Sequence, residues 1–407
     1  MREPPSERTG TALVTARARS ARMEATLAAM APFARFFSES AWAKHRDDPG
    51  IADFVFGNPH EMPLPAFVSA LERNLPPRDA MWFGYKENEP QSREVVARSL
   101  RARRGMPFEA ADVFLTTGGF AGLSVAVAAL TDPGDEVIYL TPPWFFYESI
   151  IVSHGATPVP VPIDSRTYDL DPAAVAAAIS PRTRAIIVNS PNNPTGKIYP
   201  PATLTELASL LTEASARNGR PIYLLSDEAY SRIVFDGRDF PSPTAFYPDS
   251  LLVYTYGKTL LTPGQRIGYI ALPPTMTDRQ PLREALFAAQ IVAGWAFPNA
   301  LLQHALADLE TVSIDMVHLQ GKRDKLVAAL RKLGYDLQVP EGTFYLLVRS
   351  PDPDDVSFSE LLAAEGVFVL PGSVAELPGT FRISLTASDD MIERSLSGFA
   401  KALTATT

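Results

Sequence analysis

Apolar and polar positions alternate in blocks through the middle of the chain. Short apolar runs bounded by turn residues predict buried strands, and the longer stretches between them predict helices. Buried strands that alternate with helices favour an α/β fold, with a mostly parallel sheet covered by helices on both faces. The predicted strands are 111–117, 132–140 (after a turn), 156–163, 184–190, 221–228, 250–257 and 266–273, and the predicted helices are 119–130, 144–154, 171–179 and 201–217.

The regular alternation of buried strands and helices is replaced by short strands and longer helices towards the C-terminus, and by a helical segment near the N-terminus. A long helical stretch at 301–333 precedes short strands at 344–349, 366–370 and 380–385 and a last helix at 389–403, which predicts a smaller α+β domain. We therefore expect a disordered N-terminus (1–12), a helical segment that joins the small domain (13–50), a large domain (51–310) and a small domain (311–407).

Composition excludes several classes of protein. The 407 residues are 46% hydrophobic and 20% charged, as in ordinary globular proteins, and the net charge of −9 argues against nucleic-acid binding. There is no cysteine and the five histidines lack metal-ligand spacing, so we expect no metal site. We find no apolar run of about 20 residues and no secretory signal, and therefore expect a cytoplasmic protein with no membrane contact.

Candidate chemistry follows the predicted strands, where ligands bind in open α/β sheets. Taken alone, each of the residues named below could have a purely structural role, as a turn residue, a helix cap or a surface charge. Gly257-Lys258-Thr259 imitates the end of a nucleotide-binding P-loop, but Leu252 stands where that motif needs glycine. The residues that follow the strands are Gly118 and Gly119, Asn193, Asp227 and Tyr230, and Lys258 with Arg266.

Taken together, three segments resemble pyridoxal-phosphate-dependent aminotransferases of fold type I, class I/II, the aspartate aminotransferase-like group. They are SPNNPTG (190–196), SDEAY (226–230) and YGKTLLTPGQRIGY (256–269). The resemblance extends from about residue 51 to 400 and implies a mostly parallel seven-stranded sheet flanked by helices. Gly257 and Gln265 depart from the family's usual serine and tryptophan, which indicates a divergent branch.

The resemblance implies a role for each candidate residue. Lys258 would form the Schiff base with pyridoxal 5'-phosphate and act as the base, and Asp227 would face the ring nitrogen. Tyr230, the third catalytic candidate, and Asn193 would hydrogen-bond the 3-hydroxyl oxygen, while Trp144 would stack on the ring. The phosphate would be held by Gly118, Gly119, Phe120, Thr255, Arg266 and, from the partner subunit of a homodimer, Tyr85.

The implied substrates are an amino acid and a 2-oxo acid. Arg382 would bind the substrate α-carboxylate, with Gly57 and Asn193 on the substrate side of the pocket. The substrate side chain stays open: Phe145 and Phe146 suit an apolar or aromatic group, and a dicarboxylate would need a second cation, for which Arg232 is one candidate.

The resemblance implies an aminotransferase that transfers an amino group in ping-pong half-reactions. The alternative keeps the cofactor but acts as a lyase, cyclase or oxidative enzyme of specialised amino-acid metabolism, because both pathways begin with loss of the α-proton. A transcriptional regulator with a degenerate aminotransferase-like domain is disfavoured. The residues before 51 show no helix-turn-helix, and the chain is acidic.

Overall fold

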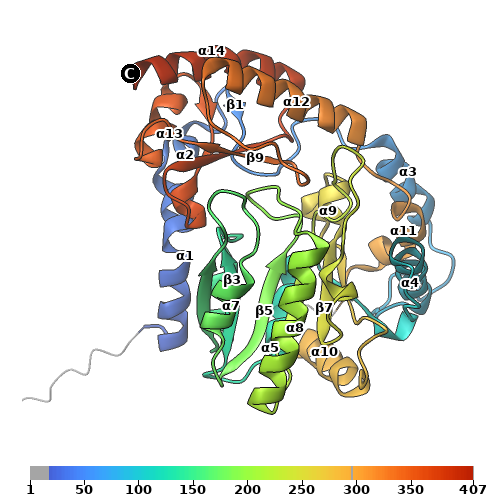
Figure 1. The fold of residues 1–407 in the computed structure, drawn as a ribbon. Coiled ribbons are helices and arrows are strands. Elements are labelled where there is room, and N and C mark those ends of the chain that lie inside the picture. Colours follow the sequence, from blue (N-terminus) through green and yellow to red (C-terminus); the bar gives the residue numbers. More distant parts are fainter. Residues whose placement is uncertain (1–17, 295–296, 407) are drawn as a thin grey trace, which may run out of the picture.

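A seven-stranded sheet forms the centre of the larger part of the molecule (Figure 1). The structure, a computed structural model, describes residues 18–294 and 297–406. Strand order is β2-β8-β7-β6-β5-β3-β4, and only the pairs that involve β8 are antiparallel. The predicted α/β fold with a mostly parallel seven-stranded sheet is confirmed. The strands are β2 (Val113–Thr116), β3 (Glu136–Thr141), β4 (Thr157–Pro162), β5 (Thr183–Asn189), β6 (Tyr223–Asp227), β7 (Ser250–Thr255) and β8 (Gly268–Ala271).

Helices cover both faces of this sheet, because successive strand residues point to opposite sides. Along β3, Val137 and Tyr139 pack with α5, α6 and α10, while Ile138 packs with α7 and α8. At the β2 and β8 edge, α3, α4 and α11 complete the second layer. The bounds are α3 (Pro65–Asn74), α4 (Pro90–Arg104), α5 (Gly119–Leu130), α6 (Tyr147–Ser153), α7 (Pro172–Ala178), α8 (Pro201–Asn218), α9 (Tyr256–Thr259), α10 (Gln280–Val292) and α11 (Ala300–Leu309).

The C-terminal part builds two small sheets against three helices. β12 lies between β9 and β11 in an antiparallel sheet, and β1 pairs in parallel with β10. The pairing places residues 52–53, which we assigned to the large domain, beside C-terminal strands; the domain bounds stay a prediction. The elements are β1 (Ala52–Asp53), β9 (Tyr345–Arg349), β10 (Val367–Phe368), β11 (Leu370–Pro371), β12 (Thr380–Ser384), α12 (Met316–Leu333), α13 (Asp355–Ala364) and α14 (Asp389–Ala405).

Two predicted elements differ from the structure. The helical stretch 301–333 is interrupted between α11 and α12, because the Asp315 side chain accepts hydrogen bonds from Val317 N and His318 N and starts a new helix. The predicted strand 366–370 is divided between β10 and β11, which belong to different sheets. Short 3-10 helices occur at Ala110–Asp112, Pro243–Ala245, Pro263–Gln265 and Gly372–Ala375.

The N-terminal helices link the two parts of the molecule. α1 (Ala21–Glu39) begins at the Ser20 cap, runs beside α6, and is followed by α2 (Ala41–His45) near the C-terminal strands (Figure 1). The N-terminus expected to be disordered (1–12) and residues 13–17 lie outside the described residues. Within the described ranges, none of the helices combines the length and apolar character needed to cross a bilayer.

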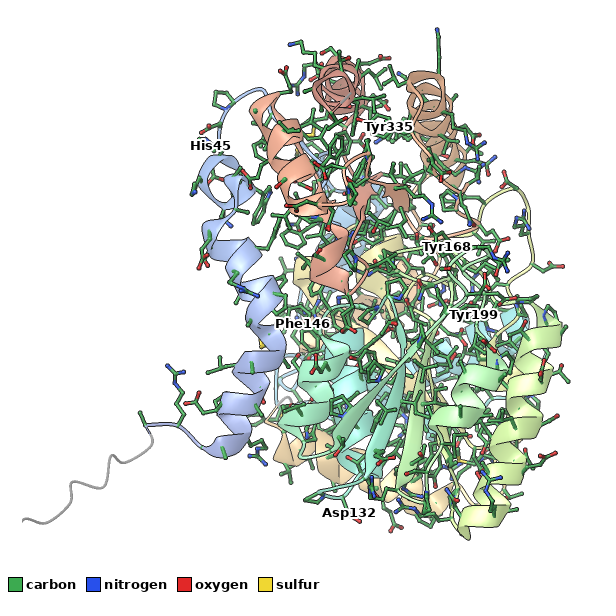
Figure 2. All side chains as sticks on the ribbon, turned by 60° about the vertical axis from the view of Figure 1, so that its left-hand side comes forward. His45, Asp132, Phe146, Tyr168, Tyr199 and Tyr335 are labelled. Atoms are coloured by element: carbon green, nitrogen blue, oxygen red, sulfur yellow. The ribbon has the colours of Figure 1, made fainter. Side chains whose placement is uncertain are left out.

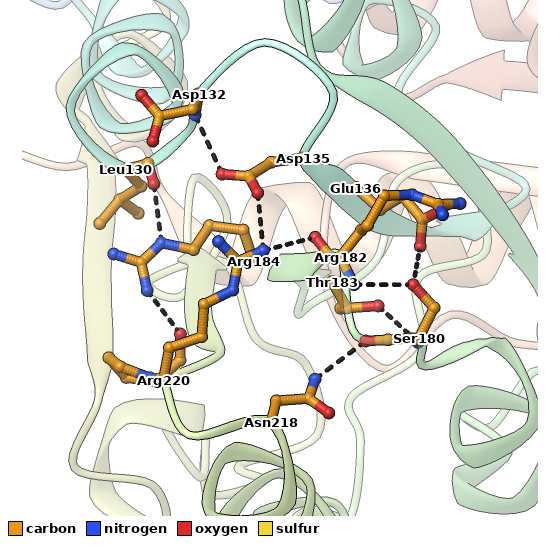
Figure 3. Close-up of polar contacts among 11 residues, drawn as sticks. Leu130, Asp132, Asp135, Glu136, Ser180, Arg182, Thr183, Arg184, Asn218 and Arg220 are labelled. Carbon is orange, nitrogen blue, oxygen red and sulfur yellow. Dashed lines mark hydrogen bonds and ion pairs between the residues drawn. The ribbon is translucent and has the colours of Figure 1, made fainter.

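A polar network closes the amino ends of β3 and β5, at the opposite edge of the sheet from their carboxyl ends (Figure 3). Arg220 Nη2 donates to Asp135 Oδ1 at 2.6 Å and to the Arg182 carbonyl at 2.9 Å. The other carboxylate oxygen of Asp135 accepts from Asp132 N at 3.0 Å. The Asp135 carboxylate therefore stabilises the turn before β3 and links it to Arg220 through an ion pair.

Replacing Asp135 is expected to cost stability but not catalysis. Asp135→Ala removes the ion pair and the turn hydrogen bond, which should lower the free energy of unfolding by about 1–3 kcal/mol. Urea denaturation at fixed protein concentration measures this. Asp132→Ala removes a carboxylate from the same turn but keeps the backbone contacts, and should stay within about 0.5 kcal/mol of wild type. Equal losses in both variants would contradict the role of Asp135.

Candidate active site

A cleft opens beyond the carboxyl ends of the parallel strands. Its walls come from the start of α5, the segment after β3, and the residues that follow β5, β6 and β7. Parallel strands bring these ends to one edge of the sheet, so residues far apart in sequence meet there. The predicted residues that line the cleft are Gly119, Phe120, Trp144, Asn193, Asp227, Tyr230, Thr255, Lys258 and Arg266.

Asp227 is a buried carboxylate at the end of β6. It is 7% exposed, and it accepts hydrogen bonds from Tyr147 Oη at 2.5 Å and from Ala229 N at 3.2 Å. Burial raises the pKa of the Asp227 carboxyl, while the Tyr147 hydroxyl, the Ala229 N–H and nearby Lys258 act in the opposite direction. The site therefore favours a cationic or protonated group beside this carboxylate.

Lys258 lies on the single turn of α9, directly after β7. Its Nζ lies 5.5 Å from the Tyr230 ring centroid and 5.7 Å from that of Phe344, so aromatic faces surround the amine. An added Cβ on the preceding Gly257 would lie 3.1 Å from Pro263 Cα, so a side chain there would require the backbone at Pro263 to shift slightly.

The start of α5 and Arg266 form an anion-binding corner. Gly118 precedes the helix with a φ of +87°, and a Cβ there would lie 2.8 Å from Arg266 Nη2. The free N–H groups at the start of α5 and the arginine therefore lie against each other. Burial lowers the pKa of Arg266, whose Nη1 donates to the Pro263 carbonyl at 2.8 Å. Thr255 completes this side of the cleft.

Arg382 approaches the cleft from β12. It is buried, and it donates from Nη1 to Asn193 Oδ1 at 3.0 Å and from Nη2 to the Val55 carbonyl at 2.8 Å. Its guanidinium lies 3.9 Å from the Tyr345 ring centroid, while its buried Nε has no partner among the described residues. A substrate carboxylate that enters the cleft would therefore meet a guanidinium group that is already held in place and still has an unpaired N–H to donate.

Two further candidate residues, Gly57 and Tyr230, lie against Phe344 and Tyr345, and the Tyr345 ring in turn contacts Arg382. Gly57 has no space for a side chain, because a Cβ would lie 2.6 Å from Phe344 Cε2 and 2.8 Å from Tyr345 Oη. Tyr230 is buried against these two rings, at centroid distances of 5.3 and 6.0 Å. Burial raises the pKa of the Tyr230 hydroxyl well above its usual value; Tyr345 adds to this effect, while Arg382 opposes it.

One predicted cofactor residue lies apart from the cleft. Tyr85, in the segment between α3 and α4, is fully exposed and contributes nothing to the cleft of its own chain. Met81 and Phe83, in the same segment, are also exposed. This position is what a residue given to a partner subunit would require.

Sequence reasoning missed two polar residues that shape the site. Tyr147 holds the Asp227 carboxylate, and Asn189 links two site segments. The Asn189 amide donates to the Asp227 carbonyl at 2.9 Å, and its Oδ1 accepts from Asn193 N at 2.7 Å. A signal for Asn189 existed, because it is a polar residue near the end of an apolar strand. Tyr147 gave none, since the same position suits a core residue.

Residues 51–399 match the family described as aminotransferase class I and II. The chain belongs to this family. It is 33% identical over 320 residues to the aspartate/prephenate aminotransferase of Thermus thermophilus, covering 77% of this chain and 81% of that relative. The aspartate aminotransferase from Thermus thermophilus with maleate superposes with a TM-score of 0.81 at 29% identity, over 95% and 100% of the two chains. An aminotransferase from Eubacterium rectale gives 0.84 at 30% identity, over 95% and 96%.

The aminotransferase family uses pyridoxal phosphate and transfers amino groups between amino acids and 2-oxo acids. This chain is therefore a pyridoxal-phosphate-dependent aminotransferase. Its relatives are named as aminotransferases, which gives no support to the lyase, cyclase or oxidative alternative.

The residues of the cleft fit this cofactor. The corner of α5 and Arg266 suits a phosphate, and the buried Asp227 carboxylate suits a protonated ring nitrogen. Trp144 offers an aromatic face on the cleft wall, and Lys258 supplies the amine. The negatively charged phosphate would therefore face Arg266, and the positively charged ring nitrogen would face Asp227.

Removing the hydroxyl of Tyr147 should change the pH dependence of cofactor binding. Its hydrogen bond stabilises the charged form of Asp227 and so lowers the pKa of that carboxyl. In Tyr147→Phe this pKa should rise, and the carboxylate should be protonated at higher pH. When apoprotein is titrated with pyridoxal phosphate, we expect affinity to begin falling at higher pH than in wild type as the solution is acidified.

Tyr247→Phe is the matched control. It removes another buried hydroxyl, which donates to the Ile222 carbonyl at 2.9 Å away from the cleft. The pH at which its affinity for pyridoxal phosphate begins to fall should match that of wild type. If Tyr147→Phe and Tyr247→Phe give the same profile, the hydrogen bond to Asp227 does not control cofactor binding.

Proposed function

We propose that this aminotransferase uses Lys258 as the residue that holds the cofactor and transfers the proton. The observation that carries the proposal is the meeting of Lys258, the buried Asp227 and the α5–Arg266 corner in one cleft. When bound, pyridoxal phosphate supplies an electron sink that stabilises negative charge at the substrate Cα. With the cofactor bound, the free amine of Lys258 would take the proton from the substrate Cα and deliver it to the cofactor's C4′ carbon.

The other candidate residues would bind the cofactor and the substrate and fix their orientation. Asp227 keeps the ring nitrogen protonated, because its buried carboxylate stabilises a positive neighbour. Asn193 and Tyr230 would hydrogen-bond the ring hydroxyl of the cofactor. Arg382 binds the α-carboxylate through its planar fork, which fixes the direction in which Cα presents its proton to Lys258.

The remaining cofactor contacts belong to the ring face and the phosphate. Trp144 would cover the face of the ring. Gly118, Gly119 and Phe120 at the start of α5, Thr255 at the end of β7 and Arg266 just before β8 would hold the phosphate.

Labelling tests the assignment of Lys258. Borohydride reduction of the holoenzyme followed by peptide mass spectrometry should place the cofactor on the peptide that contains Lys258. Lys258→Ala should lose the label and at least about 10²–10⁴-fold of turnover. Lys44→Ala removes an exposed lysine on α2 and should keep both properties. A label on any other lysine would overturn the assignment.

We further propose a homodimer in which Tyr85 completes the phosphate site of the partner subunit. Support comes from the exposure of Met81, Phe83 and Tyr85 on one segment, since exposed apolar side chains grouped together mark contact surfaces. Gly57 would line the substrate side of the cleft, beside Phe344 and Tyr345. The cytoplasmic location expected from the sequence stays a prediction.

Subunit mixing tests whether Tyr85 acts across the dimer. Tyr85→Ala and Lys258→Ala should each have low activity, but co-refolded chains should regain it. Random pairing makes half of the dimers mixed, each with one intact site of two, so roughly a quarter of wild-type activity should return. If Tyr85 serves its own subunit, mixing will restore nothing beyond the sum of the two variants.

A further inference from the structure

We propose that the amino-acid substrate carries an aromatic or large apolar side chain, bound against the rings of Phe33, Phe145 and Phe146. These three residues are called the aromatic wall below. The inference rests on the proposed function, because it assigns a substrate class to the same cleft.

The aromatic wall joins two elements that are distant in sequence. Phe33 lies on α1, whereas Phe145 and Phe146 directly precede α6. The ring of Phe33 stacks on Phe145 at 4.8 Å between centroids and lies 4.9 Å from Phe146 (Figure 2 labels Phe146 beside α1). All three side chains are half-buried, so they keep surface free for a ligand.

The aromatic wall reaches the cleft at its cofactor end. Phe146 lies 5.3 Å from Trp144 and 5.0 Å from Phe120, and both of these rings line the cleft. The rings therefore form a continuous apolar surface from the proposed cofactor face to α1. Such surfaces bind apolar and aromatic groups through burial and ring contacts.

The aromatic wall also reaches the carboxylate end of the site. Phe56 lies 6.1 Å from Phe33 and 6.5 Å from Phe145. The residue before it, Val55, accepts the hydrogen bond from Arg382. A substrate whose α-carboxylate binds Arg382 therefore has aromatic rings within reach of its side chain.

The cleft has no unassigned cation for a second carboxylate among the residues the structure describes. Its positively charged lining residues are Lys258 and Arg266, which already have roles. Arg232, the candidate considered from the sequence, is buried elsewhere: it binds Glu310 Oε1 at 2.8 Å and lies 4.4 Å from the Tyr254 ring centroid. An unpaired carboxylate against aromatic faces would be costly, so these residues of a single chain select against acidic side chains.

Donor selectivity tests the inference directly. The holoenzyme is mixed with phenylalanine, leucine, alanine or aspartate, without oxo acid, and the cofactor absorbance and the 2-oxo acid product are followed. We expect kcat/KM for phenylalanine and leucine to exceed that for aspartate by at least about tenfold. Aspartate stands in the names of relatives, so preference for it is the informative opposite result and would overturn the inference.

Variants of α1 separate specificity from folding. Phe33→Ala should lower kcat/KM for phenylalanine by about tenfold but leave that for alanine within about twofold, because the small side chain does not reach the ring. Phe33→Leu should recover part of the loss. Leu27→Ala removes an exposed apolar side chain earlier on α1; it is the control and should keep the wild-type ratio.

The outcomes distinguish the two proposals. If neither phenylalanine nor leucine yields a 2-oxo acid, the substrate class is wrong, whereas the proposed function is decided separately by the borohydride label on Lys258. If aspartate reacts best, or if Phe33→Ala slows phenylalanine and alanine equally, the assigned function stands and the substrate class is wrong.

Discussion

A carboxylate buried at the end of a central strand is the constraint on which the site depends. Charge at Asp227 is unfavourable in a poorly solvated position, so the fold must bring donors to it. Tyr147 comes from the start of α6, the Ala229 N–H from the turn after β6, and Lys258 from the turn after β7. The parallel sheet is what brings these three segments to one point.

The end of the cleft formed by the start of α5 and Arg266 favours negative charge, whereas the Asp227 end favours positive charge. Gly118 and Arg266 approach each other so closely that a side chain at Gly118 would collide with the guanidinium. Arg266 itself has a φ of +50°, a left-handed conformation that costs about 1–2 kcal/mol for a residue with a side chain. Such strain is stored where a site needs one geometry. A ligand with a phosphate and a protonated ring nitrogen matches this separation of charge.

The sequence was most informative where chemistry follows from chain order. Asn193, Asp227 and Lys258 could be grouped because each follows a buried strand, and the structure brings them to one cleft. Local patterns could not reveal contacts formed by distant segments. The pairing of β1 with β10 and the support that Tyr147 gives to Asp227 both depend on tertiary packing. The interruption after α11 was missed for another reason: apolar periodicity outweighed a single capping signal at Asp315.

One residue proposed to contact the substrate lies outside the stretch that contains the proposed cofactor residues. The proposed cofactor residues lie within 51–399, the stretch that matches the family, whereas Phe33 lies before it on α1. α1 packs on α6 and continues into α2, where Trp42 donates to Asp53 Oδ2 at 3.1 Å and packs with Phe368. One helix system therefore touches both the sheet layer and the C-terminal strands. A change on α1 can alter the surface offered to a substrate side chain without disturbing Lys258, Asp227 or the phosphate corner. The family's chemistry can thus be retained while its substrate changes.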